Sequence, residues 1–381
     1  MRSQDLHQRL ADLGAKPLHC GRIVRAWLQG RALDACTARQ RAEDFLPLGV
    51  RHGLPQVAAE LEGIARLHSE HPASDGSSRL LVELADRQMV ESVLLPRGGL
   101  CVSTQVGCAV GCVFCMTGRS GLLRQVGSLE MVAQVVLARR RRAVKKVVFM
   151  GMGEPAHNLD NVLEAIDLLG TDGGIGHKNL VFSTVGDPRV FERLPRQRVK
   201  PALALSLHST RAELRRQLLP KAPPLSPEEL VEAGEAYARR VDYPIQYQWT
   251  LLELPKAPPL SPEELVEAGE AYARRVDYPI QYQWTLLEGI NDSLEEMDGI
   301  LRLLKGRFAV MNLIPYNSMD GDAYRRPSGE RIVELVRYLH SRGVLTKVRN
   351  SAGQDIDGGC GQLRARATQG TAERRIPARQ A

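Results

Sequence analysis

Strand-like and helix-like segments alternate along most of this chain. The strand-like segments are rich in Val, Leu and aromatic residues and lie at 100–105, 146–150, 179–184, 202–207, 245–252, 280–287 and 308–314. Helical patterns separate them at 128–140, 160–169, 211–219, 226–240, 261–275, 293–304 and 328–342. Such alternation predicts βαβ units and a parallel sheet. We therefore expect an α/β fold, a partial (β/α)6 barrel whose functional groups lie at the carboxyl ends of the strands.

One segment of the chain is repeated without a change. Residues 219–253 recur as 254–288, and each copy is 35 residues long. Repeat architectures drift in sequence and need about three units or more to bury a core, so two identical copies indicate a tandem duplication that adds one extra helix–strand unit. Only the second copy continues directly into the sequence around Asn291. We expect its strand, 280–287, to take the place in the barrel, with the extra helix and strand at the surface or added to the sheet.

The two ends of the chain differ from its middle. Residues 1–75 contain short helical patterns without a clear strand, which predicts a small helical accessory domain. The polar segment 70–78 contains Pro, Gly and several Ser, as a linker would. We assign the barrel core to residues 80–365. The last residues, 366–381, are basic and lack a core-forming pattern, which predicts a disordered tail.

Three cysteines stand close together after the first expected strand. Cys108, Cys112 and Cys115 form a Cys-x3-Cys-x2-Cys pattern. Three thiolates can hold three irons of a 4Fe-4S cluster and leave the fourth open to a small chelating ligand. Zinc is the alternative metal, but structural zinc sites usually have four ligands in paired spacings. Phe114, just before the third cysteine, also resembles the radical S-adenosylmethionine (SAM) signature.

Small polar residues stand at the ends of the following strands. Gly-Met-Gly-Glu-Pro, residues 151–155, follows one strand directly, and its glycines permit a close approach of the backbone to a ligand. The carboxylate of Glu154 can accept hydrogen bonds from a ligand amine. Further candidates at this rim are Ser183, Ser206, Leu207, His208 and Asn291. Taken singly, each is as typical of a turn or helix cap, but together they predict a ligand-binding rim.

Composition and charge limit where this protein is expected to be located and what it is expected to bind. Seven cysteines are too few and too unevenly placed for a disulfide framework, and the N-terminus lacks the apolar stretch of a signal peptide. No apolar run approaches the roughly 20 residues that cross a bilayer. We therefore expect a soluble cytoplasmic protein without membrane contact. The net charge of +7 favours a polyanionic partner. The basic run 139–142 fits phosphate contacts or a solvated helix end equally well.

Several motifs together resemble a known family. Cys-Val-Ser-Thr-Gln-Val-Gly-Cys, the cluster motif, Gly-Met-Gly-Glu-Pro, Ala-Leu-Ser-Leu-His, Gly-Ile-Asn-Asp-Ser and Asp-Ile-Asp-Gly-Gly-Cys-Gly-Gln-Leu occur in this order. They are similar to the RlmN/Cfr family of radical-SAM RNA methyltransferases. The resemblance covers roughly residues 80–365 and is specific, because the motifs occur together; the N-terminal part is similar more loosely.

The resemblance implies a mechanism and assigns residues to it. One SAM methylates Cys360, and a second, on the cluster, yields a radical that activates the methyl group for addition to carbon 2 or 8 of an adenosine in ribosomal or transfer RNA. Glu91 matches the general base that removes the ring proton. Without the family it would be interpreted as a solvated strand-end carboxylate. Cys101 matches the thiol that forms a transient disulfide with Cys360 and releases the product. The residues implied for SAM binding are Gly153, Glu154, Ser183, Ser206, Leu207, His208 and Asn291.

The family also implies partners, and two other functions stay open. The leading interpretation is a monomer that acts on RNA. It uses two SAM molecules per turnover and takes electrons from a flavodoxin or ferredoxin. The first alternative is a radical-SAM enzyme acting on a peptide or small molecule, which has no need of Cys101 and Cys360. The second is a non-catalytic RNA-binding iron–sulfur protein, which needs no Gly-Met-Gly-Glu-Pro loop.

Overall fold

The computed structural model describes the chain in ranges separated by gaps. These ranges are 2–35, 41–113, 115–119, 121–206, 212–243, 246–248, 280–307, 309–316 and 325–348, with the single positions 263, 266, 267, 270, 271 and 274. The chain divides into two compact units. The first comprises residues 1–207, 215–248 and 359–381, and the second comprises 208–214 and 249–358.

The first unit is built on an eight-stranded sheet of order β1-β2-β3-β4-β7-β8-β9-β10. Its parallel part contains β4 (Gly99–Cys101), β7 (Lys146–Phe149), β8 (Leu180–Thr184), β9 (Ala202–Ser206) and β10 (Gln246–Gln248). Every residue of β8 is buried, as expected for a strand covered on both faces. Since parallel strands place their carboxyl ends at one edge, this sheet brings the expected rim residues of β7, β8 and β9 to the same side.

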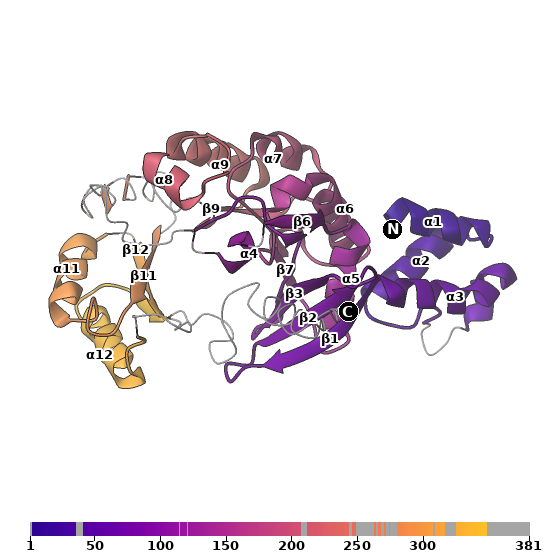
Figure 1. Cartoon of the computed structure of the whole chain (residues 1–381), viewed down its shortest axis with the longest axis horizontal. Coiled ribbons are helices and arrows are strands. Elements are labelled where there is room, and N and C mark those ends of the chain that lie inside the picture. The colour runs from indigo at the N-terminus through magenta and orange to yellow at the C-terminus, as the bar shows by residue number, and fades with distance from the viewer. Residues whose placement is uncertain are drawn as a thin grey trace, which may run out of the picture. The chain divides into compact units, whose positions relative to one another are not determined.

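Helices cover the parallel strands, as the alternation predicts. They are α5 (Ser128–Arg139), α6 (Leu159–Gly170), α7 (Pro188–Arg193), α8 (Ala212–Leu218) and α9 (Pro227–Val241), with the short helices η2 (Pro155–Asn158), η3 (His177–Asn179) and η4 (Leu194–Arg196). In Figure 1, α6, α7 and α9 lie on the outer side of the sheet that contains β7 and β9. Ser226 caps α9 by accepting a hydrogen bond from the Glu229 N–H, and the Glu229 side chain accepts one from the Ser226 N–H.

Three antiparallel strands extend the sheet at the other edge. They are β1 (Ala65–Pro72), β2 (Ser78–Leu84) and β3 (Met89–Leu95). β3 pairs antiparallel with β4 and so joins them to the parallel part. The linker expected over residues 70–78 is therefore wrong. His71 and Pro72 pair with Arg79 and Ser78, so the polar stretch is the turn of a β-hairpin. Its partner strand supplies the hydrogen bonds that local composition does not reveal.

The N-terminal helices share the core of this sheet. These are α1 (Ser3–Asp12), α2 (Pro17–Leu28) and α3 (Leu48–Ile64), with η1 (Ala42–Asp44) between them. Their apolar side chains, such as Leu10, Trp27 and Val57, belong to the same buried cluster as the strands. The helices are thus present as expected, but they do not form a core separate from that of the sheet.

The arginines of the basic run at the end of α5 form hydrogen bonds and an ion pair with other parts of the protein. The Arg139 guanidinium donates to the carbonyl oxygens of Leu28 and Gly173, at 2.7 and 2.8 Å. Arg141 pairs with Glu70 at 2.8 Å, and Arg142 donates to the Gly76 carbonyl at 2.7 Å. These arginines hold α5 to neighbouring elements, a role that neither sequence interpretation included.

The second unit contains a three-stranded parallel sheet of order β11-β12-β13. The strands are β11 (Ile280–Leu286), β12 (Ala309–Pro315) and β13 (Thr346–Val348), with the helices α11 (Leu294–Leu304) and α12 (Gly329–His340). A separate buried cluster, which includes Leu286, Met297, Leu313 and Leu335, forms its core. No helix in the described ranges has the length and hydropathy to cross a bilayer.

The two copies of the duplicated segment are divided between the units. In the first copy, the Tyr237 hydroxyl in α9 donates to the Pro201 carbonyl, and β10 pairs with β9. In the second copy, Val266 lies in the core of the second unit, and β11 pairs with β12 over its whole length. The same strand sequence therefore serves one neighbour in the first unit and a different neighbour in the second.

Candidate active site

A narrow hairpin carries the three clustered cysteines. Its stem is β5 (Gln105–Gly107) paired with β6 (Leu122–Gln125), and the short helix α4 (Met116–Arg119) lies within its loop. The strand expected over residues 100–105 is thus two strands, because the chain leaves the sheet after β4. Gly107 has φ +83°, and a Cβ there would lie 1.9 Å from the Gly121 carbonyl oxygen. Only glycine permits this close approach, which brings the ends of the loop together.

The thiols of this loop influence one another electrostatically. Cys108 is buried, Cys112 and Cys115 are partly buried, and all three are free. Burial, with the neighbouring thiols and Glu154 adding to it, raises the pKa of Cys108 to about 11 and that of Cys112 to about 12. A thiol must lose its proton to ligate a metal, so loading this loop releases protons and is favoured by high pH.

The donor set suits an iron–sulfur cluster. Among the described residues, no three His, Cys, Asp or Glu side chains converge closely enough to hold one metal ion. An iron–sulfur cluster does not require its ligands to converge on one ion, because each thiolate binds its own iron. Cys108, Cys112 and Cys115 supply three thiolates within electrostatic reach of one another, on a loop whose stem is a pair of antiparallel strands.

The loop after β7 approaches the base of this hairpin. A Cβ on Gly151 would lie 2.7 Å from the Val102 carbonyl oxygen, and one on Gly153 would lie 2.5 Å from Cβ of Gln105. Gly153 also has φ +101°, which L-residues rarely adopt. Both glycines are therefore required for the close packing that places Glu154 beside the cysteine loop.

The Glu154 carboxylate lies at the centre of a buried hydrogen-bond set. It accepts from the N–H groups of Ala156 and Val185, each at 3.0 Å, and from the Thr184 side chain. A carboxylate offers about four acceptor positions, so one is left for a ligand. Burial raises the pKa of Glu154 to about 7 despite these bonds. A cationic ligand amine would favour its charged form.

Three carboxamide side chains join the Glu154 loop to the cysteine hairpin. Gln105 accepts from the Glu154 N–H at 2.8 Å and donates to Gln125 at 2.9 Å, and Gln125 donates to the His157 carbonyl at 2.9 Å. Asn158 donates to the carbonyls of Thr104 and Val126, at 2.8 and 2.7 Å. The sequence analysis did not identify these three residues. The one feature of the sequence that could indicate them is a polar side chain near the glycines at the strand ends.

The remaining rim candidates are distributed as follows. Ser183 is buried in β8 and Ser206 ends β9, so both lie on the edge that carries Glu154. Asn291 is in the second unit, where its side chain accepts from the Leu287 N–H at 2.8 Å. Ser293, two residues after Asn291, is not a rim candidate: it caps α11 by accepting from the Glu296 N–H. Leu207, His208 and Cys360, like Phe114, lie outside the described residues.

Glu91 and Cys101 lie on the adjacent antiparallel strands β3 and β4. Glu91 is 1% exposed and forms an ion pair with Arg79 at 3.3 Å. Its interpretation as a solvated carboxylate is therefore wrong. Arg79 was not foreseen, because its partner lies across the β2–β3 hairpin. Cys101 is buried at the end of β4, opposite Val93.

The pKa of Glu154 gives a testable pH dependence. In the metal-free protein its raised pKa means that the native state binds a proton more tightly than the unfolded chain, so the free energy of unfolding falls as pH rises from about 5 to 7. The difference of about 2.5 between the native pKa and the ordinary value of 4.5 corresponds to about 3 kcal/mol in the free energy of unfolding. Urea unfolding across this pH range gives the free energy of unfolding of the wild type and of Glu154→Gln. The difference between these two free energies should change by about this amount. A constant difference between the two proteins contradicts the assignment.

Comparison with known proteins agrees with this geometry. Residues 102–243 match the model of the radical SAM superfamily. A probable RNA methyltransferase of Pseudomonas aeruginosa strain PAO1 is 91% identical over 100% of both chains. Another, from Chromobacterium violaceum, is 65% identical over 96% of this chain and 94% of the relative. The crystal structure of a radical SAM methyltransferase from Sphaerobacter thermophilus is similar with a TM-score of 0.63 and 30% identity, covering 95% of this chain and 97% of that one. This chain belongs to the RlmN/Cfr family of the radical SAM superfamily.

Proposed function

We propose that this protein methylates a ring carbon of an adenosine in RNA, using Cys360 as the methyl carrier. The observation that carries the proposal is the placement of Glu154 beside the loop of Cys108, Cys112 and Cys115. The end-to-end similarity to probable RNA methyltransferases supports RNA as the substrate. The modified atom is carbon 2 or carbon 8, and the RNA is ribosomal or transfer RNA.

The residues divide the work as follows. When bound, the cluster and SAM supply a one-electron cleavage that generates a radical. Cys108, Cys112 and Cys115 hold the cluster, and Glu154 accepts a hydrogen bond from the SAM amino group, using its remaining acceptor position. Gly153, Ser183 and Ser206 of the first unit also take part in SAM binding, and the family resemblance assigns Leu207, His208 and Asn291 to the same ligand.

The later steps use the groups of β3 and β4. Once the carrier carbon of Cys360 is bonded to the base, the Glu91 carboxylate takes the ring proton. Arg79 holds that carboxylate in place within a buried strand. The Cys101 thiolate then attacks the sulfur of Cys360, so that an S–S bond forms while the S–C bond to the product breaks. The product carbon keeps the electron pair of that bond and takes up a proton to become the methyl group, and the unpaired electron left by radical addition returns to the one-electron carrier. The disulfide is transient and must be reduced before the next turnover.

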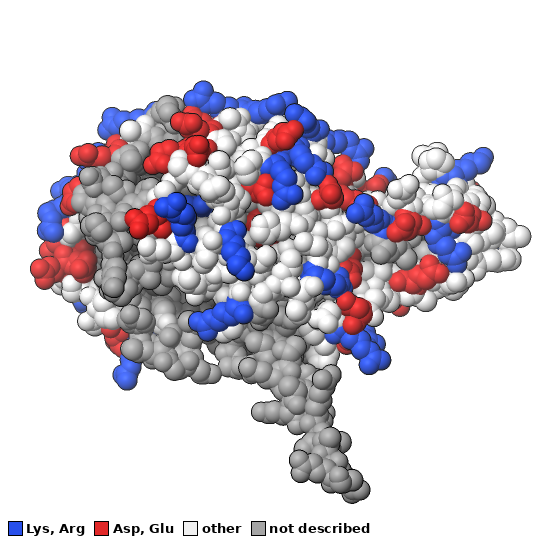
Figure 2. Space-filling view, turned by 45° about the horizontal axis from the view of Figure 1, so that its top comes forward, with Lys and Arg blue, Asp and Glu red and all other residues white. Residues whose placement is uncertain are grey.

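The proposal extends to partners and location. An acidic one-electron donor such as flavodoxin or ferredoxin supplies the electron, and two SAM molecules are used per turnover. The protein acts as a cytoplasmic monomer, with the helices of residues 1–75 assisting in RNA contact. Over the face shown in Figure 2, positive side chains are interspersed with negative ones. RNA is therefore expected to be recognised largely through an unpaired adenosine taken out of its stack.

Replacing Cys360 tests the proposal directly. We expect Cys360→Ala to keep SAM cleavage to 5′-deoxyadenosine within about tenfold of the wild type and to form no methylated adenosine, because only the carrier is lost. Mass spectrometry of nucleosides from treated RNA, beside liquid chromatography of 5′-deoxyadenosine, measures both. The matched control is Cys20→Ala, which alters a buried thiol in α2.

Each alternative function predicts a different outcome. SAM cleavage with unmodified RNA in the wild type itself would indicate a radical-SAM enzyme acting on a peptide or small molecule. Absence of SAM cleavage in fully loaded wild type would indicate a non-catalytic iron–sulfur protein. Methylated RNA from Cys360→Ala would disprove the carrier role.

A further inference from the structure

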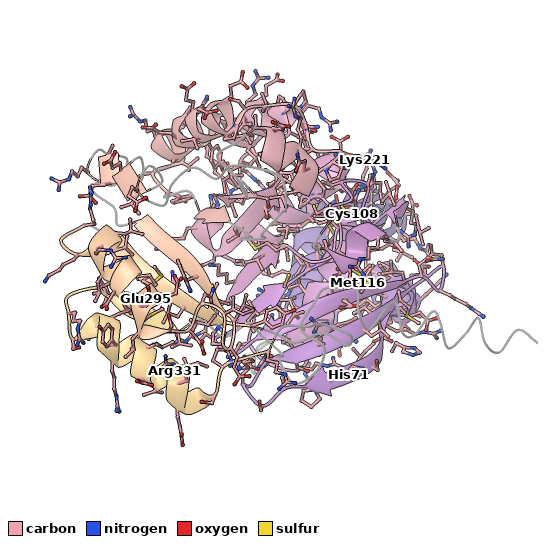
Figure 3. The ribbon with its side chains drawn as sticks, turned by 60° about the vertical axis from the view of Figure 1, so that its left-hand side comes forward. His71, Cys108, Met116, Lys221, Glu295 and Arg331 are labelled. Carbon is pink, nitrogen blue, oxygen red and sulfur yellow. The ribbon has the colours of Figure 1, made fainter. Side chains whose placement is uncertain are left out.

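Helix α8 is bonded directly to the cysteine loop. The Val113 N–H donates to the Leu218 carbonyl at 3.1 Å, and the Lys221 N–H donates to the Val110 carbonyl at 3.2 Å. These bonds flank Cys112, so the end of α8 holds the part of the loop that carries the middle thiol. Figure 3 shows Lys221 and Cys108 in the same region of the first unit.

An arginine of this helix is buried beneath the loop. Arg215, one turn before Leu218, is 2% exposed. One terminal nitrogen of its guanidinium donates to the carbonyl oxygens of Val185 and Ser206, at the ends of β8 and β9. Its Nε is buried and has no hydrogen-bond partner in the described part of the chain. Both acceptors are neutral, so these hydrogen bonds supply no counter-charge to the guanidinium.

The ionisable groups that interact electrostatically with this guanidinium belong to the site. They are Cys112 and Glu154, whose ionised forms its positive charge favours. Glu154 already accepts three hydrogen bonds from other partners. Burying a charge without a counter-charge is strongly unfavourable. A protein retains such a residue where a bound anion supplies the missing charge.

We propose that Arg215 is the counter-charge of the iron–sulfur cluster and raises its reduction potential. A 4Fe-4S cluster with three thiolates is anionic, and reduction makes it more negative by one charge. A fixed cation in a low-dielectric site stabilises the reduced form more than the oxidised form. Arg215 therefore eases the electron transfer that precedes SAM cleavage. This role rests on cluster binding and not on the RNA substrate.

Redox titration of the reconstituted protein, without SAM or RNA, tests this role. The variants are Arg215→Gln and Arg215→Lys, and electron paramagnetic resonance measures the reduced cluster. We expect Arg215→Gln to lower the ratio of reduced to oxidised cluster at a fixed potential about tenfold, which is a shift of about 59 mV for one electron. Arg215→Lys keeps the charge but not the guanidinium hydrogen bonds, and it should stay near the wild type. Arg216→Gln, an exposed neighbour on α8, is the control for net charge.

The outcomes separate a charge role from a structural one. An unchanged potential in Arg215→Gln at full iron content overturns the proposal. Equal shifts, or equal losses of iron, in the Gln and Lys variants also overturn it, because hydrogen bonding would then account for the effect. Iron retained by the Lys variant and lost by the Gln variant supports it. Failure to methylate RNA would leave the potential unaffected, so the two proposals are tested separately.

Discussion

Cys112→Ala is expected to remove the iron–sulfur cluster and, with it, SAM cleavage. The loop supplies three thiolates, and a cluster with an open iron cannot lose a further ligand without losing its attachment. Replacing even an outer-shell partner of a metal costs up to about 100-fold in affinity or activity. We expect a larger loss of 5′-deoxyadenosine formation and less than one tenth of the wild-type iron content.

Iron analysis and the absorption spectrum of anaerobically reconstituted protein measure this loss. Cys20→Ala is the matched control, because Cys20 is also a buried thiol of the first unit but lies in α2. Its iron content should equal that of the wild type. Full iron content in Cys112→Ala, or zinc in place of iron in the wild type, would refute the assignment of this loop.

Removing one copy of the duplicated segment is expected to stabilise the protein. Deletion of 219–253 and deletion of 254–288 yield the same shortened chain, because the copies are identical. In the described part of the chain β10 pairs with β9 along one edge, and β11 pairs with β12 along one edge. A single copy of this strand can pair with β9 on one side and β12 on the other. Both pairings are parallel, so one strand direction satisfies them.

The gain comes from backbone groups that pair at both edges of one strand. Each hydrogen bond contributes about 0.5–1.5 kcal/mol net, and several are gained at once. We expect Tm to rise by at least about 5 °C and iron occupancy to increase, as measured by calorimetry and iron analysis. Deletion of 366–381 is the control and should leave Tm unchanged. A lower Tm or a loss of iron in the shortened chain would show that both copies are needed.

Sequence periodicity predicted the parallel strands and their helices closely. β7, β8 and α5 begin or end within one residue of the expected positions, because their apolar runs are long and their flanks carry turn and cap residues. The β1–β2 hairpin was missed, since β1 contains His, Glu and Pro and is stabilised by pairing with a strand elsewhere. Propensity is local, whereas strand pairing is not.

The candidate site divides in the same way. Spacing suggested the three clustered cysteines as metal ligands, and the position of Glu154 in a glycine loop after the next strand suggested it as a ligand contact; both assignments stay predictions. Gln105, Arg79 and Arg215 could not be identified in this way. Each contacts a partner distant in sequence or outside its own element: Gln105 the Glu154 N–H, Arg79 the Glu91 carboxylate, and Arg215 the carbonyls of Val185 and Ser206.

The order of residues by itself determined the α/β class, the spacing of the three clustered cysteines and the identity of the duplicated segment. These properties depend on local spacing, which the chain carries whether or not it is folded. Only the tertiary structure decided which strand each copy pairs with, which charges are buried and which carboxamides join the two loops. Burial and pairing depend on distances across the sheet, and those distances exist only once the chain is packed.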